Sequence, residues 1–348
     1  MPDDCRLGVI GAGAWGTALA QVFAGEKSPT LLWTRNDGLV QSINSDHRNR
    51  RYLPAIELSG SVRATGRLAE MVDRSVLLLV TPAQHARMIL SALPPFTGDL
   101  VLCSKGIESG TGNLISEVAR AEQPDAAIAV LSGPTFAHEV AAGLPTAVTL
   151  ACSGGEAQWT RLSAALARPS FRPYFSADVI GAQVGGAVKN VLAVGCGVVA
   201  GLGLGENARA ALIARGFAEM LRFGEALGAK RETLAGLCGL GDLVLSCSSR
   251  WSRNFSFGKA LGEGANAAEL MANRTTVAEG TSTAPVLVEI AAKLGIILPI
   301  GTAVYRLLSG ASAPEVVDEL LARPLAAEGG AGLCLMGWTP PDGIDVPR

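Results

Sequence analysis

The 348-residue chain is poor in charged residues, and its few charges nearly cancel. Asp, Glu, Lys and Arg make up 17% of it against 49% hydrophobic residues, and 29 basic residues face 31 acidic ones. So apolar a composition is not that of a disordered chain. It also lacks the basic excess that a nucleic-acid-binding protein uses for phosphate contacts. The length allows two domains of ordinary size, each with its own core.

The sequence also lacks the spacings typical of a metal site or a disulfide scaffold. Its three histidines, His47, His85 and His138, form no HxxH or HExxH pattern, and its seven cysteines include no CxxC pair. The cysteine count is odd and the flanking residues are mostly apolar. We therefore expect no metal site, and buried free thiols in a reducing compartment.

No apolar run is long enough to predict a membrane span, although the mean hydropathy is +0.32. The most apolar stretch, residues 191–204, holds 14 residues without a charge, whereas a span needs about 20. We expect it to be a buried core helix and predict no membrane insertion. The N-terminus carries Asp3 and Asp4 and lacks an apolar segment, so no signal peptide is predicted.

Glycine, in contrast, is abundant, with 42 residues and no collagen-like period. The motif GAGAWG, residues 11–16, follows a strand-like run at 6–10 and precedes a helical pattern and a second strand at 30–33. In this context G-x-G-x-x-G predicts a dinucleotide site. Gly11 allows the tight turn, Gly13 lets the backbone approach a pyrophosphate, and Gly16 lets the helix pack closely on the strand. The free N–H groups of the helix start would face the phosphates.

The following residues continue the alternation of strands and helices. Further strands are expected at 76–80, 100–103, 127–131 and 146–150. This alternation predicts an α/β fold with a doubly wound parallel sheet, in which ligands bind beyond the carboxyl ends of the strands. Lys105 and the loop at Gly133 follow such ends.

From residue 180 onward the periodicity is helical. Helices are expected at 181–201, 207–227, 231–238, 257–262, 267–271, 282–294, 302–308 and 314–321. We therefore predict a dinucleotide-binding domain at 1–178, an all-α substrate and catalytic domain at 179–330, and a loose C-terminal tail at 331–348.

The end of the second strand lacks the acidic residue that usually binds the ribose hydroxyls of NAD. Thr34 and Arg35 stand there instead, and Asp37 follows two residues later. Arg35 can pair with a 2′-phosphate, which favours NADPH. NADH stays an alternative, because Asp37 could serve a ribose and Arg35 could be an ordinary surface residue. The basic loop at 47–54 could meet a phosphate or be solvated surface charge.

Seven motifs, in order, carry a resemblance to a known family. They are GAGAWGTALA at 11–20, SKGIE at 104–108, SGPTFA at 132–137, GGAVKN at 185–190, NARAALI at 207–213, GLGDLV at 239–244 and SRN at 252–254. The chain resembles the bacterial NAD(P)-dependent sn-glycerol-3-phosphate dehydrogenases over about residues 6–325. Two positions depart from the family: Ala55, where Gly is usual, and His138, where some members have Lys.

The resemblance implies a Rossmann-type N-terminal domain, a helical C-terminal domain and a homodimer. It implies the reversible reduction of dihydroxyacetone phosphate to sn-glycerol 3-phosphate. This reaction would take place in the cytoplasm and supply the backbone for glycerophospholipid synthesis. Hydride transfer to a ketone leaves negative charge on oxygen, which needs a proton donor or cation nearby. The resemblance assigns this role to Lys189, as acid in reduction and base in oxidation. At the start of an apolar helix, burial would lower its pKa, although a lone lysine there is more often a surface residue.

The resemblance also implies the remaining ligands. Asp242 could orient Lys189, accept a substrate hydroxyl, or simply cap a turn, and Trp15 could equally be ordinary packing. The substrate-binding residues would be Lys105, Gly133, Thr135, Lys189, Asp242, Ser252, Arg253 and Asn254. The cofactor-binding residues would be Gly11, Gly13, Ala14, Trp15, Gly16, Arg35, Lys105, Ala137, Arg253, Val277 and Glu279.

Two other functions remain open on the sequence. One is a related two-domain dehydrogenase of another small hydroxy acid or phosphorylated sugar, against which the SRN and GLGD motifs argue. The other is a non-catalytic dinucleotide-binding sensor, which would tolerate loss of Lys189.

Overall fold

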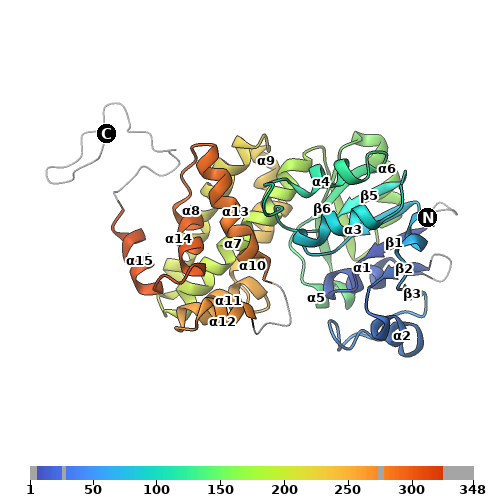
Figure 1. Ribbon diagram of the computed structural model, residues 1–348, viewed down its shortest axis with the longest axis horizontal. Coiled ribbons are helices and arrows are strands. Elements are labelled where there is room, and N and C mark those ends of the chain that lie inside the picture. The colour runs from blue at the N-terminus through green and yellow to red at the C-terminus, as the bar shows by residue number, and fades with distance from the viewer. Residues whose placement is uncertain (1–5, 26–28, 273–277, 324–348) are drawn as a thin grey trace.

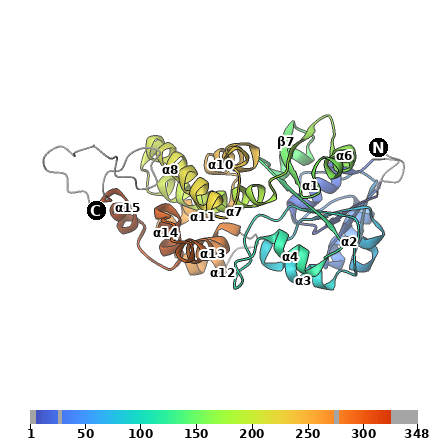
Figure 2. The same ribbon diagram turned by 90° about the horizontal axis from the view of Figure 1, so that it is seen from above.

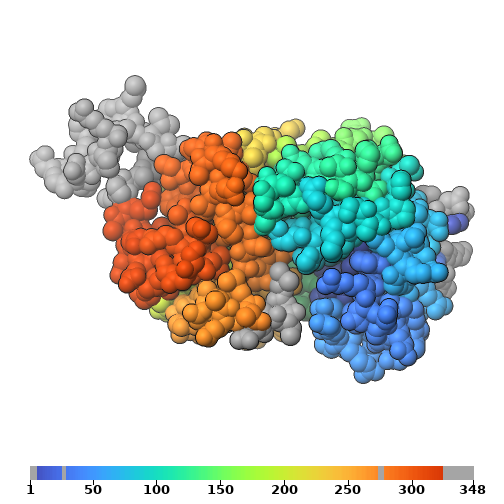
Figure 3. All heavy atoms as spheres, in the orientation of Figure 1, coloured from blue at the N-terminus to red at the C-terminus, as the bar shows by residue number. Residues whose placement is uncertain are grey.

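The computed structural model describes residues 6–25, 29–272 and 278–323. A part built on a β-sheet and a part built of helices lie side by side, with α7 running from one to the other (Figures 1 and 2). Their side chains touch along the middle of the molecule (Figure 3). The tail predicted at 331–348 lies outside the described residues.

The sheet has eight strands in the order β3-β2-β1-β4-β5-β6-β7-β8. Strands β1 to β6 pair in parallel. The strands are β1 (Leu7–Ile10), β2 (Thr30–Trp33), β3 (Val62–Thr65), β4 (Val76–Leu79), β5 (Asp99–Leu102), β6 (Ala127–Ser132), β7 (Thr146–Cys152) and β8 (Phe171–Ser176). The order reverses between β1 and β4, which is where a doubly wound sheet binds its ligand. The predicted fold class, a Rossmann-type sheet followed by helices, is confirmed.

Helices of the sheet part connect these strands. They are α1 (Ala14–Phe23), α2 (Asp37–Asp46), η1 (Leu68–Asp73), η2 (Ala83–His85), α3 (Ala86–Ala92), α4 (Ile115–Glu122), α5 (Ala137–Ala141) and α6 (Gly155–Leu166). The helical part follows with α7 (Val179–Gly201), α8 (Gly205–Ala226), α9 (Arg231–Leu234), η3 (Leu237–Gly241), α10 (Asp242–Cys247), α11 (Arg253–Gly262), α12 (Ala267–Ala272), α13 (Glu279–Lys293), α14 (Pro299–Leu308) and α15 (Ala313–Leu321).

The predicted parallel sheet has one exception near its edge, where β7 runs antiparallel to β6. The connection between them holds only α5, a helix of five residues that packs against α1. So short a helix does not carry the chain back across the sheet, as a parallel connection requires. Strand β8 pairs in parallel with β7 and forms the edge.

The two outermost strands, β3 and β8, were not predicted from the sequence. The sequence of β3 is VRAT, and β8 holds Pro173 and is half-exposed along its length. Proline and mixed polarity are tolerated at a sheet edge, because part of the edge faces solvent. Edge strands therefore lack the continuous apolar pattern by which the inner strands are recognised.

Helix α7 is the centre of the helical part and packs against α8, α10, α11, α13 and α14. By length and composition alone it could cross a membrane, but 89% of its most apolar 18-residue window is buried inside the structure. A core helix of a soluble protein passes the same test. The prediction of a buried core helix at 191–204 holds as far as Val199, and the helix ends at Gly201.

Helices α7 and α11 touch backbone to backbone. A Cβ on Gly197 would lie 2.1 Å from the carbonyl oxygen of Phe255, and one on Gly258 would lie 1.9 Å from that of Val194. Only glycine fits such contacts. This close packing fixes the start of α11 against the middle of α7.

The five described cysteines are all buried and free: Cys103, Cys152, Cys196, Cys238 and Cys247. Burial raises the pKa of the Cys152 and Cys238 thiols to about 11. The prediction of buried free thiols is confirmed for these five residues, whereas Cys5 and Cys334 lie outside the described residues.

A buried carboxylate joins two helices far from the sheet. Glu219 on α8 is 4% exposed and accepts hydrogen bonds from the N–H groups of Ile300 (2.7 Å) and Gly301 (3.0 Å) at the start of α14. Burial raises its pKa to about 7, although both N–H groups favour the ionised form. This carboxyl therefore ionises at a higher pH in the folded protein than in the unfolded chain.

We predict that Glu219 makes stability depend on pH. Because its folded-state pKa is raised above its ordinary 4.5, the stability it contributes falls as pH rises from about 4.5 to about 7. Between pH 5 and 8 the free energy of unfolding of wild type should fall relative to Glu219→Gln by about 2 kcal/mol. Denaturant unfolding at several pH values measures the free energy of unfolding of wild type and of Glu219→Gln. Glu225→Gln, exposed on the same helix, is the control. Parallel pH curves for wild type and Glu219→Gln would contradict the assignment.

Candidate active site

The carboxyl ends of the central strands form one edge of the sheet. Gly11 follows β1, Thr81 lies just beyond β4, Lys105 just beyond β5, and Gly133 follows β6. These strands are parallel and adjacent in the sheet, so the four residues lie along the same edge. Most of the predicted site residues of the sheet part are on the loops that start here.

The glycine turn has the geometry that the motif predicts. Gly11 has φ +117°, and a Cβ on Gly16 would lie 1.8 Å from the carbonyl oxygen of Gly11. Gly13 caps the N-terminus of α1, and a Cβ placed on it would meet no atom within 4 Å. Ala14 and Trp15 are the first residues of α1, so their N–H groups belong to a helix N-terminus, which favours an anion.

Three buried polar atoms near this edge make no hydrogen bond within the described chain. They are Nε1 of Trp15, Oγ1 of Thr81 and Oγ of Ser132. Buried polar groups in native proteins nearly always have a partner. Together with the open space above Gly13, these atoms fit a polar ligand lying along the strand ends, as a nicotinamide dinucleotide would.

The basic loop that follows α2 is tied to the glycine turn. The buried Asn49 side chain donates to the carbonyl oxygen of Ala12 (2.9 Å) and to Oγ1 of Thr17 (2.8 Å). Within the loop Arg48 forms an ion pair with Glu57 at 2.9 Å. The loop therefore lies beside the glycine turn, held there by Asn49.

Arg35 and Asp37 lie beyond the end of β2. Arg35 is exposed, and Asp37 is the exposed first residue of α2. Because β2 pairs with β1, with Trp33 beside Ile10, both follow the strand next to the glycine turn. Whether either residue contacts a cofactor stays a prediction.

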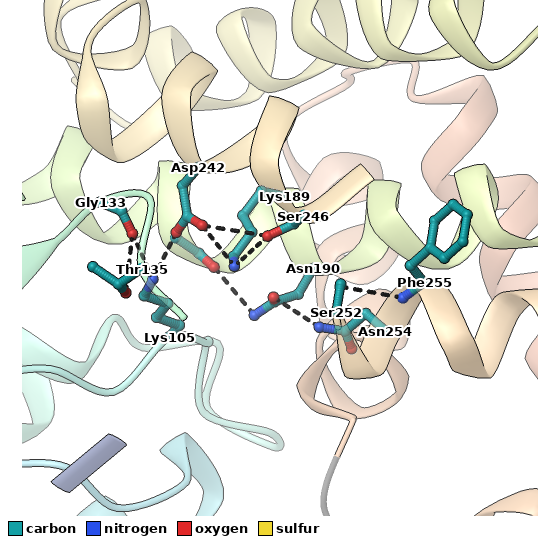
Figure 4. Close-up of polar contacts among 11 residues, drawn as sticks. Lys105, Gly133, Thr135, Lys189, Asn190, Asp242, Ser246, Ser252, Asn254 and Phe255 are labelled. Atoms are coloured by element: carbon teal, nitrogen blue, oxygen red, sulfur yellow. Dashed lines mark hydrogen bonds and ion pairs between the residues drawn. The ribbon is translucent and has the colours of Figure 1, made fainter. Parts of the chain in front are cut away.

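Two lysines meet one buried carboxylate where the sheet part faces the helical part. Nζ of Lys105 is 2.6 Å from Oδ2 of Asp242, and Nζ of Lys189 is 2.9 Å from Oδ1 of the same residue. Nζ of Lys105 also donates to the carbonyl oxygen of Gly133 at 3.1 Å. Figure 4 shows the two ammonium groups on either side of Asp242. Thr135 lies close by, its hydroxyl directed at the same Gly133 oxygen at 3.4 Å.

Burial and charge act against one another in this cluster. Burial lowers the pKa of the Lys189 ammonium and Lys105 lowers it further, while Asp242 opposes both. Burial alone would raise the pKa of Asp242, but the two ammonium groups outweigh it and hold that pKa below its ordinary value. An ionised Asp242 beside a lysine of lowered pKa is an arrangement that can hold or release a proton at the Nζ of Lys189.

Lys189 lies in the interior of α7, as the helix predicted at 181–201 places it, and not at the start of an apolar helix. The helix begins at Val179, where the Asp178 carboxylate accepts the N–H of Gly181 at 2.8 Å. The lysine side chain is 10% exposed. Asp178 is thus the N-cap of α7, and the helix begins two residues before the predicted start at residue 181.

Two residues of the network were not assigned from the sequence. The hydroxyl of Ser246 accepts a hydrogen bond from Nζ of Lys189 at 2.8 Å, and Asn190 accepts one from the side chain of Asn254 at 2.8 Å. Ser246 stands four residues after Asp242 on α10, so both face the same side of that helix. That spacing was readable, but α10 itself was not among the predicted helices.

The SRN motif begins α11 beside this network. Oγ of Ser252 accepts the N–H of Phe255 at 3.3 Å and caps the helix. The buried Asn254 side chain bonds Asn190 and accepts the N–H of Gly280 at 3.0 Å. Ser252 and Asn254 thus have structural contacts of their own, and Arg253, between them, is the first residue of α11.

The remaining predicted site residues stand at element ends. Ala137 is the first residue of α5 and Glu279 the first of α13. Burial raises the pKa of Glu279, while the charge of Arg253 opposes this. Val277 lies outside the described residues. The structure thus brings together the predicted substrate residues from Lys105 to Asn254. Arg35, a predicted cofactor residue, follows β2 and so lies on the other side of β1 from Lys105.

A sheet with a glycine turn at its switch point, facing a buried lysine on a separate helical part, defines the class of two-domain nicotinamide-dependent dehydrogenases. Comparison with known families then narrows the class. The N-terminal and C-terminal regions described as NAD-dependent glycerol-3-phosphate dehydrogenase match residues 6–158 and 178–318. The chain belongs to this family, and it depends on NAD(P).

Individual relatives agree. Glycerol-3-phosphate dehydrogenase [NAD(P)+] of Erythrobacter litoralis is 64% identical over 323 residues, which is 93% of this chain and 98% of that protein. That of Novosphingobium aromaticivorans is also 64% identical, with the same coverage. Among solved structures, the glycerol-3-phosphate dehydrogenase of Coxiella burnetii is 37% identical with a TM-score of 0.87, covering 92% of this chain and all of that one. A D-mandelate dehydrogenase, at 15% identity and TM-score 0.62, shares the fold alone.

We predict that Gly13→Ala blocks cofactor binding without disturbing the fold. Gly13 has φ −67°, which alanine adopts freely, and its Cβ would point into empty space above the turn. Titration should show the Kd for NADPH raised at least about tenfold, because the added methyl group would displace the pyrophosphate from close contact with the backbone. The Tm should change by less than about 2 °C, because the added methyl meets no atom. Gly25→Ala, also without a neighbour within 4 Å, is the control. Unchanged NADPH affinity would show that no phosphate approaches Gly13.

Proposed function

We propose that this protein reversibly reduces dihydroxyacetone phosphate to sn-glycerol 3-phosphate with NAD(P)H, with Lys189 as the proton donor. The observation that carries the proposal is the pairing of Lys189 and Lys105 with one buried carboxylate, Asp242, beside the strand ends. Membership of the family supports the substrate. The product is the glycerophospholipid backbone.

The nicotinamide, when bound, supplies the hydride that adds to the carbonyl carbon. The chain supplies the proton: Nζ of Lys189 gives it to the oxygen as the C–O double bond becomes a single bond, and Lys189 is left neutral. Burial favours this step, because it lowers the pKa of Lys189. The Asp242 carboxylate and the Ser246 hydroxyl, both bonded to Nζ, orient the ammonium group. In the oxidation, neutral Lys189 takes the proton back.

Lys105 supplies a second positive charge beside the developing alkoxide. Its ammonium is held by Asp242 and by the Gly133 carbonyl oxygen, so it needs no reorganisation when charge appears on the substrate. The substrate phosphate would lie at the start of α11, where the Arg253 guanidinium and the helix N-terminus favour an anion. Gly133, Thr135, Ser252 and Asn254 would line this end of the site.

The cofactor would lie over the glycine turn. Gly11, Gly13, Ala14, Trp15 and Gly16 would hold its pyrophosphate and nicotinamide end, helped by Lys105 and Arg253. Ala137 and Glu279 would complete its contacts. Arg35 would bind a 2′-phosphate, so we propose a preference for NADPH over NADH.

Several properties of the whole protein belong to the same proposal. We propose a cytoplasmic homodimer without membrane insertion, with residues 1–178 as the cofactor domain and 179–330 as the substrate and catalytic domain. The burial of α7 supports the absence of insertion, and the free buried thiols suit a reducing compartment.

We predict that Lys189→Ala abolishes turnover while leaving cofactor binding intact. Loss of a general acid costs about 10²- to 10⁴-fold in rate, and Lys189 lies in α7, not in the glycine turn. NADPH oxidation with dihydroxyacetone phosphate measures the rate, and NADPH titration measures binding. Lys293→Ala, an exposed lysine on α13, is the control. A rate loss of less than about tenfold in Lys189→Ala would overturn the mechanism. The wild-type protein separates the alternative functions. If it binds NADPH but never oxidises it, the protein is a non-catalytic dinucleotide-binding sensor. If it is active only on another hydroxy acid or sugar phosphate, it is a related two-domain dehydrogenase.

We predict that Arg35→Ala weakens the binding of NADPH but not that of NADH. Loss of a charge-assisted bond to the 2′-phosphate should raise the KM for NADPH about tenfold and leave that for NADH within about twofold. Steady-state rates with each cofactor test this. Arg172→Ala, exposed on β8 at the opposite end of the sheet, is the control. Equal losses with both cofactors would show that Arg35 does not read the 2′-phosphate.

A further inference from the structure

Three rings stand in a row between the two parts of the molecule. The rings of Phe136 and His138 stack with centroids 5.9 Å apart and planes 18° apart. The ring of Trp251 lies against His138 with centroids 5.0 Å apart and planes at 46°. Phe136 and His138 belong to the segment after β6, and Trp251 to the loop between α10 and α11. We call these three residues the ring row.

The ring row joins the two segments that border the site. One segment begins at Gly133, whose carbonyl oxygen holds Lys105. The other continues from Trp251 into Ser252 and Arg253, and then into Asn254, which is bonded to Asn190 next to Lys189. A contact between these segments therefore sets the spacing of the substrate site across the two parts.

Other bonds of the Trp251 loop are local to the helical part. The N–H groups of Trp251 and Ser252 both bond Ser249, at 3.2 and 3.0 Å, and Oγ of Ser256 donates to the carbonyl oxygen of Arg250 at 2.8 Å. These bonds orient the loop on α11. They do not orient it relative to the sheet part, whereas the ring contact does.

Trp251 is not a core residue. It is 63% exposed, so its truncation removes little buried area and should cost little stability. Yet tryptophan is large and stiff, and a paired aromatic ring contributes beyond its buried area. An exposed indole held against a ring of the other part is suited to position a loop rather than to stabilise a core.

We propose that the ring row is a clasp that positions Arg253 for the phosphate end of the substrate, with Trp251 and His138 as positioning residues. The proposal rests on the proposed function, because it takes the substrate to be a small phosphate ester bound at the start of α11. Trp251 and His138 act through the loop that carries Arg253. They therefore govern substrate affinity and leave the proton transfer at Lys189 unchanged.

The test compares Trp251→Ala, His138→Ala, the double variant and Trp251→Phe in NADPH oxidation with dihydroxyacetone phosphate. Loss of an aromatic pair should raise the KM for dihydroxyacetone phosphate about threefold to tenfold, with kcat within about twofold. Trp251→Phe keeps a ring and should stay near wild type. The double variant should be no worse than the worse single variant, because both changes break one contact.

The chain offers a matched control. Phe175 on β8 lies against Trp159 with centroids 5.7 Å apart and planes at 50°, a similar pair at the far edge of the sheet. Phe175→Ala should leave both KM and kcat unchanged, and thermal unfolding should show all variants folded.

The outcomes separate the clasp from the function. A wild type without turnover overturns the proposed function. If the wild type is active, three results would overturn the clasp. The first is an unchanged KM for dihydroxyacetone phosphate in Trp251→Ala, and the second is additive effects in the double variant. The third is an equal rise in that KM for Phe175→Ala. Tryptophan fluorescence tests the ring contact directly. The fluorescence lost when Trp251 is replaced by Phe should differ between the wild-type protein and the His138→Ala variant. Identical losses in the two proteins would show that the two rings do not touch.

Discussion

The site depends on one carboxylate that is buried between two ammonium groups. Asp242 is 1% exposed, and a lone buried charge of this kind would cost several kcal/mol. Lys105 from the sheet part and Lys189 from α7 both bond it, so the two parts share one charge cluster. Removing any one of the three charges leaves the others incompletely compensated in a region that water barely reaches. A contact that joins the two parts thus also affects the pKa of Lys189: Asp242, which bonds Lys105, opposes the lowering of the Lys189 pKa.

The surrounding structure serves to bring this cluster together. Lys189 is buried only because α7 passes through the core of the helical part, and α7 can be approached so closely only because glycines face it. Gly197 and Gly258 let α7 and α11 meet backbone to backbone. The start of α11, with Arg253, is thereby held near Asn190 and Lys189. On the sheet side, the parallel strands bring Gly11, Lys105 and Gly133 to a single edge, where polar atoms of Trp15, Thr81 and Ser132 make no hydrogen bond within the described residues.

Much of the fold could be predicted, and the failures have physical causes. The inner strands are continuous apolar runs and the glycine turn has a fixed spacing, so both are visible in the sequence. The edge strands β3 and β8 carry mixed side chains, and the reversal of β7 depends on how α5 packs against α1, which no local pattern encodes. The start of α7 was predicted to within two residues, at 181 instead of Val179. Ser246 was missed because its partner, Lys189, is remote in sequence, and Asn190 was missed because its partner, Asn254, is remote as well.

The sequence by itself determined the inner strands, most helices of the helical part, the glycine turn at residues 11–16 and, through seven ordered motifs, the family. These are local properties: strand and helix periods, the conformational needs of glycine, and residue types at short spacings. Only the tertiary structure decided that Lys105, Lys189 and Asp242 form one cluster, that the Trp251 loop meets His138, and that one edge of the sheet is antiparallel. Each of these joins residues far apart in the chain, because burial and charge pairing act through space and leave no periodic trace along the sequence.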